Sequence, residues 1–280
     1  LYLSLMSGKL FIVATPIGNL GDITYRAIKT IESCDYILAE SSERTSKLLN
    51  HYNLKKKIIT FNKKNEKLKH SSIINDLKSG KQIVLVSDAG TPSISDPGFA
   101  LLRHQNDDFS VLPVPGPSSV TSALSISPIP INTFTFLGFL PKKINDLEKK
   151  LIQIKNSEIP VIIFENKTRL SRLLLQVNKI CGKATPVCIF RELTKIHEEI
   201  IYGPVNHLVE NLDNIKFSGE FTIIIGVAKK ESIELTKLTS QISKLSKSYT
   251  TKEIVDILLL FCDLSKKDLY NFVLSVRQKE

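Results

Sequence analysis

The sequence is short of the residues that build metal sites and disulfide frameworks. It holds four cysteines in 280 residues, and no two of them have a CxxC spacing or stand near a histidine in a zinc-binding pattern. The five histidines are scattered, and no HxxxH pair stands out. We therefore expect no metal site, and we interpret the cysteines as small buried side chains in a reducing compartment.

Long apolar runs are also missing. No stretch reaches the roughly 18 apolar residues that a membrane-spanning helix needs. Residues 1–6 are apolar but lack the basic start and the small-residue cleavage site of a signal peptide. We expect a soluble, cytoplasmic protein that has no membrane partner.

Three common signatures of nucleotide binding and hydrolysis are absent. No GxGxxG follows the first apolar run, which argues against a dinucleotide-binding fold. The chain also lacks the GxxxxGK(S/T) loop of an NTPase and the GxSxG elbow of a serine hydrolase. These absences argue against a dinucleotide-dependent enzyme, an NTPase and a serine hydrolase, but they do not indicate which reaction the chain catalyses.

Lysine, by contrast, is abundant. Lys and Arg number 38 against 28 Asp and Glu, a formal net charge of +10, and only 7 of the 38 are arginines. A basic balance favours an anionic partner such as nucleic acid, although biased codon usage also produces lysine excess. Seven lysines fall within residues 55–69, for which a solvated loop and an RNA-backbone contact are alternative interpretations.

Apolar and amphipathic segments alternate through the first 227 residues. We expect strands at 9–14, 35–39, 57–61, 82–87, 110–115, 133–138, 160–165, 186–191 and 220–227. We expect helices at 24–31, 45–52, 71–79, 99–104, 118–125, 145–155, 168–180 and 205–211. This alternation predicts a parallel sheet covered on both faces in the first half, and a second half that is also α/β.

A segment with three prolines and a glycine, residues 113–119, divides the chain. Because such a segment neither continues a helix nor sits inside a sheet, we predict a domain boundary there. The predicted domains are an N-terminal α/β domain at 1–115 and a C-terminal α/β domain at 116–230. A helical extension is expected at 231–280, with helices at 251–261 and 266–277 whose apolar face indicates core packing.

Two loops rich in glycine and proline, residues 15–22 and 87–98, follow predicted strands. Ligands of open α/β sheets bind at the carboxyl ends of the strands. The second loop contains Asp88 and Asp96 and no basic residue, which suits a ligand of positive character. For either loop taken alone, a plain turn is the alternative.

Four segments taken together resemble one family. They read VATPIGNLGD at 13–22, SDAGTPSISDPG at 87–98, VPGPSS at 114–119 and FLGFLP at 136–141. Over about residues 8–227 the chain resembles the tetrapyrrole methylase superfamily, and within it the branch that methylates 16S ribosomal RNA. The resemblance implies a two-domain α/β fold and S-adenosylmethionine bound in a folded shape between the domains. It also implies a homodimer and 2′-O-methylation of a cytidine ribose in the small ribosomal subunit.

The resemblance also implies the residues of the site. Cofactor contacts are expected at Pro16, Gly18, Asp88, Ala89, Gly90, Ser93, Ile94, Ser118, Ser119, Phe164, Arg169, Arg191, Glu192, Leu193, Glu220 and Thr222. As catalytic residues we expect Asp88 or Glu40 to act as general base and Arg44 to steer a phosphate. For Arg191 and Glu192, a structural ion pair at a strand end is the alternative.

The chain departs from that branch in two places. After Glu40 the family usually has Asp-Thr-Arg, whereas residues 41–44 read SSER. After Glu165 the family usually has Pro-His-Arg, whereas residues 166–169 read NKTR. Two alternatives therefore stay open: a small-molecule methylase acting on a tetrapyrrole, and a non-catalytic RNA-binding or ribosome-assembly protein, which the departures favour.

Overall fold

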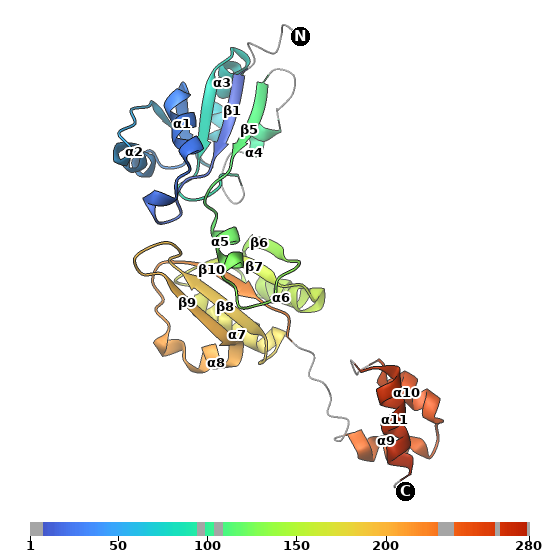
Figure 1. The fold of residues 1–280 in the computed structure, drawn as a ribbon. Coiled ribbons are helices and arrows are strands. Elements are labelled where there is room, and N and C mark those ends of the chain that lie inside the picture. The colour runs from blue at the N-terminus through green and yellow to red at the C-terminus, as the bar shows by residue number, and fades with distance from the viewer. Residues whose placement is uncertain (1–7, 94–98, 104–108, 229–237, 261–263, 279–280) are drawn as a thin grey trace. The chain divides into compact units, whose positions relative to one another are not determined.

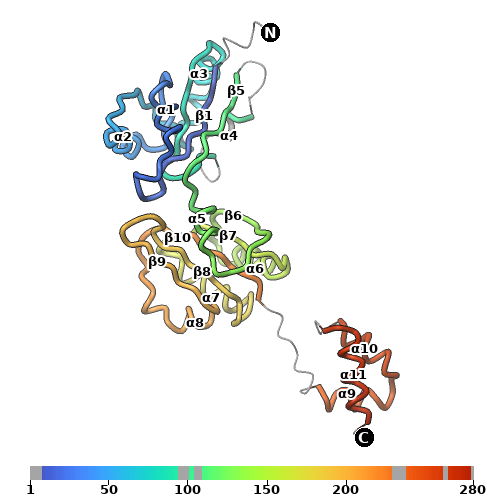
Figure 2. Tube along the Cα trace, in the orientation of Figure 1, coloured from blue at the N-terminus to red at the C-terminus, as the bar shows by residue number. Residues whose placement is uncertain are grey.

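The computed structural model describes residues 8–93, 99–103, 109–228, 238–260 and 264–278. The chain forms two compact units, residues 1–226 and 227–280 (Figure 1). Figure 2 follows the chain through the two sheets of the first unit and on to the helices of the second. Each unit is described by itself.

The first sheet is parallel throughout, as the sequence predicts. Its strands stand in the order β3-β2-β4-β1-β5, and every neighbouring pair is parallel. The strands are β1 (Gly8–Val13), β2 (Tyr36–Ala39), β3 (Ile58–Thr60), β4 (Gln82–Val86) and β5 (Phe109–Val114). Because all strands run in one direction, the loops that follow them meet at one edge of the sheet.

Helices cover both faces of this sheet. They are α1 (Tyr25–Ser33), α2 (Ser42–His51), α3 (Glu66–Lys78) and α4 (Phe99–Leu102), with a 3-10 turn η2 at Leu20–Asp22. Alternate strand residues point to opposite faces. One face packs against α3 and α4 and buries Leu10, Tyr36, Leu38, Ile83 and Leu85. The other packs against α1 and α2 and buries Val13, Ile37, Ala39, Val84 and Val86.

The strand expected at 110–115 is found as β5 and includes Pro113, so the expectation that residues 113–119 do not sit inside a sheet is wrong at that residue. β5 is the edge strand of the sheet, where a missing backbone N–H leaves no gap in the hydrogen-bond ladder. The chain leaves the sheet after Val114 and enters α5 (Ser119–Ser125). The predicted domain limits at 115 and 230 stay predictions.

The second sheet is mixed. Its order is β6-β7-β10-β8-β9; β6 and β7 are parallel, and the other neighbours are antiparallel. The strands are β6 (Thr135–Phe139), β7 (Val161–Asn166), β8 (Pro186–Arg191), β9 (Glu199–Pro204) and β10 (Glu220–Ile225). The sequence did not predict β9, an edge strand with few buried residues that returns directly beside β8.

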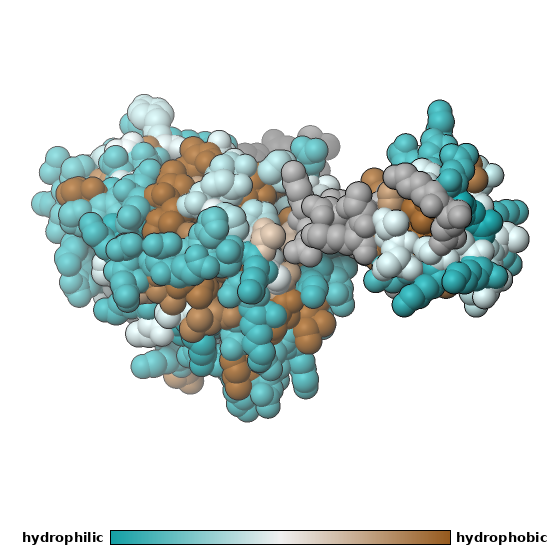
Figure 3. Space-filling model, turned by 90° about the horizontal axis from the view of Figure 1, so that it is seen from below, coloured by the Kyte–Doolittle hydropathy of each residue, from teal (hydrophilic) through white to brown (hydrophobic). Residues whose placement is uncertain are grey.

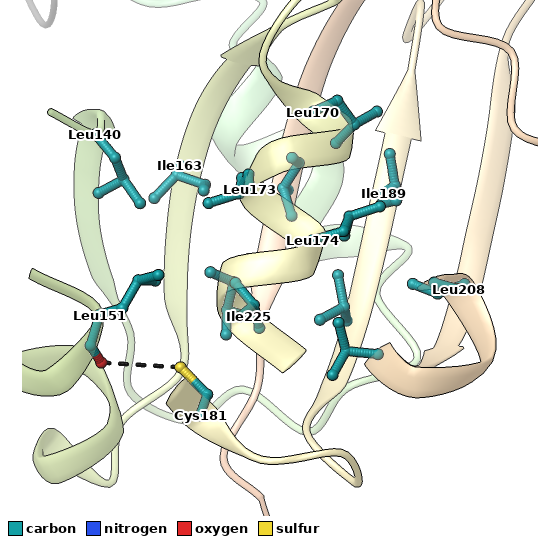
Figure 4. Close-up of a cluster of buried hydrophobic side chains, with 14 of the residues drawn as sticks. Leu140, Leu151, Ile163, Leu170, Leu173, Leu174, Cys181, Ile189, Leu208 and Ile225 are labelled. Carbon is teal, nitrogen blue, oxygen red and sulfur yellow. Dashed lines mark hydrogen bonds between the residues drawn. The ribbon is translucent and has the colours of Figure 1, made fainter. Parts of the chain in front are cut away.

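The core of the second half packs between its sheet and two long helices. These helices are α6 (Ile144–Ser157) and α7 (Leu170–Cys181), and α8 (Val205–Glu210) closes one end. Figure 4 shows Leu170, Leu173 and Leu174 of α7 directed at Ile163, Ile189 and Ile225 of the sheet. The Cys181 thiol donates a weak hydrogen bond to the Leu151 carbonyl (Sγ···O 3.8 Å).

The cysteines that the structure describes, Cys34, Cys181 and Cys188, are free and buried, which confirms their predicted packing role. Burial raises the pKa of Cys34 and Cys181 to about 11 and that of Cys188 to about 12, so these thiols stay protonated at neutral pH. Cys262 lies outside the described residues.

The second unit consists of three helices over its described residues, α9 (Thr239–Ser246), α10 (Thr251–Leu258) and α11 (Lys266–Arg277). The latter two were predicted and α9 was not. They share a core made of Ile242, Ile254, Val255, Leu258, Leu269, Val273 and Val276. A capping box between Thr250 and Glu253 begins α10.

The surface of the molecule is mostly polar on the face that is drawn (Figure 3). On the face drawn in Figure 3, hydrophilic side chains predominate and apolar patches lie between them. Over the described ranges, no helix combines the length and apolar character needed to cross a membrane.

Candidate active site

A pocket of about 410 Å³ lies in the first unit and is lined by residues from both halves. The first half contributes Ile17, Glu40, Arg44, Asp88, Ala89, Gly90 and Thr91. The second contributes Ser118, Ser119, Val120, Phe139, Phe164, Glu165, Asn166, Phe190, Glu192, Leu193, Lys195, Gly219, Glu220, Phe221 and Thr222. Its volume is in the range of pockets that bind small molecules.

The two glycine- and proline-rich loops are joined to each other. Thr15 and Gly90 exchange two backbone hydrogen bonds, of 2.9 and 3.0 Å. Gly90 has φ +77°, and a Cβ there would lie 3.3 Å from the side chain of Ile17. Glycine is therefore required where the second loop turns into the pocket.

Two acidic residues lie just after strands of the first sheet and line the pocket. Glu40 follows β2, and Asp88 lies two residues after β4. Asp88 Oδ2 is 3.5 Å from Arg44 Nη1, an ion pair in which the Arg44 side chain is 60% exposed. Asp88 Oδ1 is buried and has no hydrogen-bond partner among the described residues. The pocket thus holds a carboxylate oxygen free to accept a hydrogen bond.

A third carboxylate, Glu165, lies at the end of β7, with a side chain only 1% exposed. Its Oε1 accepts from the Asn166 amide at 2.9 Å, and its Oε2 is 3.2 Å from Arg169 Nη2. Burial raises the pKa of Glu165, and the Asn166 amide and Arg169 offset this only in part. Arg169 also donates to the carbonyls of Leu140 and Pro141, at 2.8 and 3.2 Å, so it holds Glu165 and the 140–141 turn together.

The loop after β8 forms another side of the pocket. Glu192 has φ +53°, and its Oε1 accepts from Lys195 Nζ at 2.9 Å and from the Glu220 amide at 2.8 Å. Lys195 Nζ also lies 2.9 Å from Glu220 Oε2. Burial acts to raise the pKa of Glu192, but Lys195 and the Glu220 amide outweigh it, so that this pKa is lowered. Burial acts to lower the pKa of Lys195, but the carboxylates of Glu220 and Glu192 outweigh it, so this pKa is raised.

The first loop and the loop after β8 approach each other closely. The Asn19 amide donates to Thr194 Oγ1 at 3.1 Å. A Cβ on Gly18 would lie 2.4 Å from Lys195 Cγ and 2.8 Å from the Leu193 carbonyl oxygen. At Gly18 the two halves of the first unit therefore pack so closely that a larger side chain would not fit.

The structure brings most of the predicted site residues together. Those that line the pocket are Glu40, Arg44, Asp88, Ala89, Gly90, Ser118, Ser119, Phe164, Glu192, Leu193, Glu220 and Thr222. Those that do not are Pro16, Gly18, Ser93, Arg169 and Arg191. Ile94 and Asp96 lie outside the described residues. The roles assigned to all these residues stay predictions.

Arg191 and Glu192 form ion pairs with different partners in the structure. Arg191 is buried and pairs with Glu199 of β9 at 2.7 Å, whereas Glu192 turns to Lys195. Within the described structure both residues form ion pairs, but with other partners rather than with each other as considered from the sequence, and the partner of Arg191 lies on a strand that the sequence did not predict. Glu165 and Lys195 were missed; for Glu165 the available signal was a lone carboxylate ending an apolar run.

Aromatic side chains supply an apolar wall. Phe164 lies 5.0 Å from Phe136 and 5.7 Å from Phe139 between ring centroids, both edge to face. Phe190 and Phe221 also line the pocket. No group of three or more metal-ligating side chains occurs in the part of the chain that is described. Carboxylates beside aromatic rings suit a small organic ligand that carries both polar and flat apolar parts.

A family model for tetrapyrrole (corrin/porphyrin) methylases matches residues 9–209. The chain belongs to this family. Two solved structures share the tetrapyrrole methylase fold: cobalt precorrin-4 methyltransferase CbiF, a cobalamin biosynthetic enzyme, and the methyltransferase CobJ. Their TM-scores are 0.57 and 0.59 at 16% and 14% identity, over 78% and 79% of this chain and 94% and 95% of theirs. The predicted fold class is confirmed.

Similar proteins also point to one group within the tetrapyrrole methylases. A protein of Thermotoga maritima is 42% identical over 78% of this chain and 98% of its own length. One of Buchnera aphidicola subsp. Acyrthosiphon pisum is 38% identical over 95% and 96%. Both are called ribosomal RNA small subunit methyltransferase I. The resemblance found in the sequence is confirmed, and this tetrapyrrole methylase is a methyltransferase.

Proposed function

We propose that this chain transfers a methyl group from S-adenosylmethionine to the 2′-oxygen of a cytidine ribose in 16S ribosomal RNA of the small subunit. The observation that carries the proposal is a pocket with aromatic walls and the unpartnered acceptor Asp88 Oδ1 in a chain up to 42% identical to rRNA small subunit methyltransferase I proteins.

The pocket fits the proposed cofactor. S-adenosylmethionine, when bound, supplies a methyl group on a positively charged sulfur that leaves as a neutral thioether. Asp88 Oδ1 and the carboxylates of Glu165 and Glu192 are acceptors for the positive and hydroxyl groups of such a ligand. Phe164 and Phe190 offer flat apolar surface to its adenine ring. Gly90 allows the backbone to approach the ligand.

The reaction places limited demands on the protein. It must hold the ribose oxygen about 3 Å from the methyl carbon, in line with the bond that breaks. Asp88 and Glu40 are the carboxylates of the first sheet that line the pocket, and either accepts the proton of the 2′-hydroxyl in this proposal. Arg44, exposed beside Asp88, contacts a phosphate of the incoming RNA.

The two departures from the family pattern have local structural uses. Ser41 caps α2 by accepting from the Arg44 amide, and this start of the helix carries Arg44 to the pocket. Thr168 donates to Asn166, and Arg169 holds Glu165. Both loops therefore keep a defined geometry at the pocket, which supports an active enzyme over an inert RNA-binding protein.

The remaining parts of the proposal concern assembly and location. A ribosomal substrate implies a cytoplasmic enzyme without DNA or membrane partners. The family resemblance implies a homodimer, which light scattering of the purified chain tests.

The decisive experiment supplies methyl-labelled S-adenosylmethionine and small ribosomal subunits that lack the modification. We expect the label on one ribose 2′-oxygen of 16S rRNA, and none when the target nucleotide is a deoxyribonucleotide. The alternative substrate class, suggested by the fold shared with a cobalt precorrin-4 methyltransferase, is tested with a tetrapyrrole acceptor. Label in the macrocycle and none in RNA would overturn the proposal.

A further inference from the structure

The structure separates the lysines of residues 55–69 into two groups. Lysines 55–57 precede β3, and lysines 63–69 follow it. At the start of β3, the Ile37 amide donates to the Lys57 carbonyl at 2.9 Å. At its end, the Phe61 amide donates to the Ala39 carbonyl at 2.7 Å. One group therefore lies at the amino edge of the parallel sheet and the other at the carboxyl edge.

Two of the seven lysines are used by the fold itself. Lys56 Nζ donates to the Cys34 carbonyl at 2.7 Å, and Lys69 Nζ donates to the Thr60 carbonyl at 2.7 Å. Both side chains are partly buried. These hydrogen bonds to backbone carbonyls explain why the two lysines are present without a bound ligand.

Three lysines at the carboxyl edge have no such structural use. Lys63, Lys64 and Lys67 are exposed, and no carboxylate within the described ranges pairs with any of them. We call these three residues the carboxyl-edge lysines. They place three exposed lysines on one short stretch of surface, formed by the loop after β3 and the first turn of α3, where Glu66 is the one acidic neighbour in the helix turn.

The carboxyl-edge lysines are neighbours of the pocket through the sheet. Ala39 of β2 pairs with Thr60 of β3, and adjacent strands lie about 5 Å apart. The next residue after Ala39 is Glu40, which lines the pocket together with Arg44. The loop that carries these lysines therefore follows the strand next to the one that leads into Glu40 and the pocket.

We propose that the carboxyl-edge lysines bind backbone phosphates of the RNA whose ribose enters the pocket. The inference rests on the proposed function. It adds the path of the RNA strand, which crosses the protein surface at the end of β3. Lysine is a compact point charge that holds phosphates without reading sequence. Several separate exposed ammonium groups suit a polyanion that spans them.

The test compares two triple variants with equal charge change. K63Q/K64Q/K67Q removes the carboxyl-edge lysines. K9Q/K55Q/K57Q removes three exposed lysines at the amino edge of the same sheet. Methyl transfer to unmodified small ribosomal subunits is measured between 50 and 200 mM salt, subunit binding is measured by co-sedimentation, and cofactor affinity by calorimetry.

For the carboxyl-edge variant we expect KM for the subunits to rise about tenfold with kcat and cofactor affinity unchanged. The slope of log affinity against log salt should fall by about 1 per lysine removed. The amino-edge variant should stay within about twofold of the wild type, since its lysines lie at the opposite edge of the sheet from the proposed path.

The outcomes separate the two proposals. Equal subunit binding by the wild type and the carboxyl-edge variant, or equal losses in both triple variants, overturns the inference while leaving the proposed function intact. A wild-type chain that transfers no methyl group to RNA overturns the proposed function. In that case, weaker co-sedimentation of the carboxyl-edge variant alone still supports RNA binding at this edge.

Discussion

At the scale of single residues, the carboxylates of the pocket differ in how they are held. Glu165 is buried against Arg169, and Glu192 is fixed by Lys195 and the Glu220 amide. Asp88 has only a solvent-exposed arginine on one oxygen and no hydrogen bond, within the described structure, on the other. Its carboxylate is therefore the one with the most freedom to interact with a substrate.

Replacing Asp88 by Asn keeps the shape and removes the charge. We expect kcat to fall by about 100-fold or more, the range of a lost general base, without a change in melting temperature. Methyl transfer to small subunits measures the effect. Asp213→Asn, a surface variant outside the pocket, is the control.

Glu40→Gln decides which carboxylate takes the proton. We expect kcat of Glu40→Gln to fall much less than that of Asp88→Asn, since only the general base takes the proton of the 2′-hydroxyl. Full activity in both would remove these carboxylates from the mechanism.

The Glu192–Lys195 pair makes stability depend on pH at both ends. The lowered pKa of Glu192 contributes stability above its unfolded value, which is lost as the pH falls through the folded pKa. The raised pKa of Lys195 contributes stability below its unfolded value, which is lost as the pH rises through the folded pKa. Lys195→Met should therefore destabilise at neutral pH by about 1 kcal/mol, or about 2–4 °C.

Thermal unfolding from pH 3 to 11 measures this difference. It should be largest near neutrality and shrink toward both extremes. Lys183→Met, at an exposed lysine outside the pocket, is the control. A difference that is constant with pH would mean that packing, rather than the ion pair, explains the effect.

At the scale of elements, the loops between strands determine how the pocket closes. The loop at 15–22 is hydrogen-bonded to Gly90 on one side and to Thr194 on the other. Gly18 is the point where it meets the loop after β8. The packing of this loop therefore links the two halves of the first unit.

Gly18→Ala tests that packing. The new methyl group would lie within 3 Å of the Leu193 carbonyl, so the backbone must shift, and we expect a loss of about 1–3 kcal/mol in stability. Cofactor affinity should fall as well, because Leu193 lines the pocket. Gly203→Ala, whose Cβ would meet nothing nearer than 3.9 Å, is the control for calorimetry and thermal unfolding. Unchanged affinity in Gly18→Ala would contradict the role of this contact.

Much of the secondary structure could be predicted because strong local signals mark it. β2 and β4 are short apolar runs, Thr24 caps α1 after β1, and Ser41 caps α2 after β2. β9 gave no such signal, since an edge strand with exposed residues lacks a clear alternation. The antiparallel pairings of the second sheet depend on contacts between distant strands, which a local pattern does not encode.

The pocket was predictable to the extent that its residues lie in distinctive loops. Asp88 and Gly90 stand out because they follow a buried strand. Lys195 did not, because its role depends on Glu192 and Glu220, which are brought together only by the β8–β10 pairing. The family resemblance, rather than spacing, supplied the remaining residues.

At the scale of the whole molecule, the chain is two units with separate cores. All residues that line the pocket lie in residues 1–226, and the second unit buries its own cluster of apolar side chains. A unit of this size has a small core and is expected to be the less stable of the two.

Removing residues 227–280 should therefore leave cofactor binding within about twofold of the full chain, because no ligand contact is lost. In calorimetric scans the full chain should show a low-temperature transition that the truncated chain lacks. A single shared transition, or a large loss of affinity on truncation, would show that the units depend on each other.

The paired hydrogen bonds between Thr15 and Gly90 have a practical consequence for redesign. These bonds tie the loop at Thr15 to the loop at Gly90, 75 residues later in the chain. A change in the length of one loop would therefore displace the other. Anyone who grafts a different acceptor specificity onto this scaffold would have to exchange both segments at once, as a matched set.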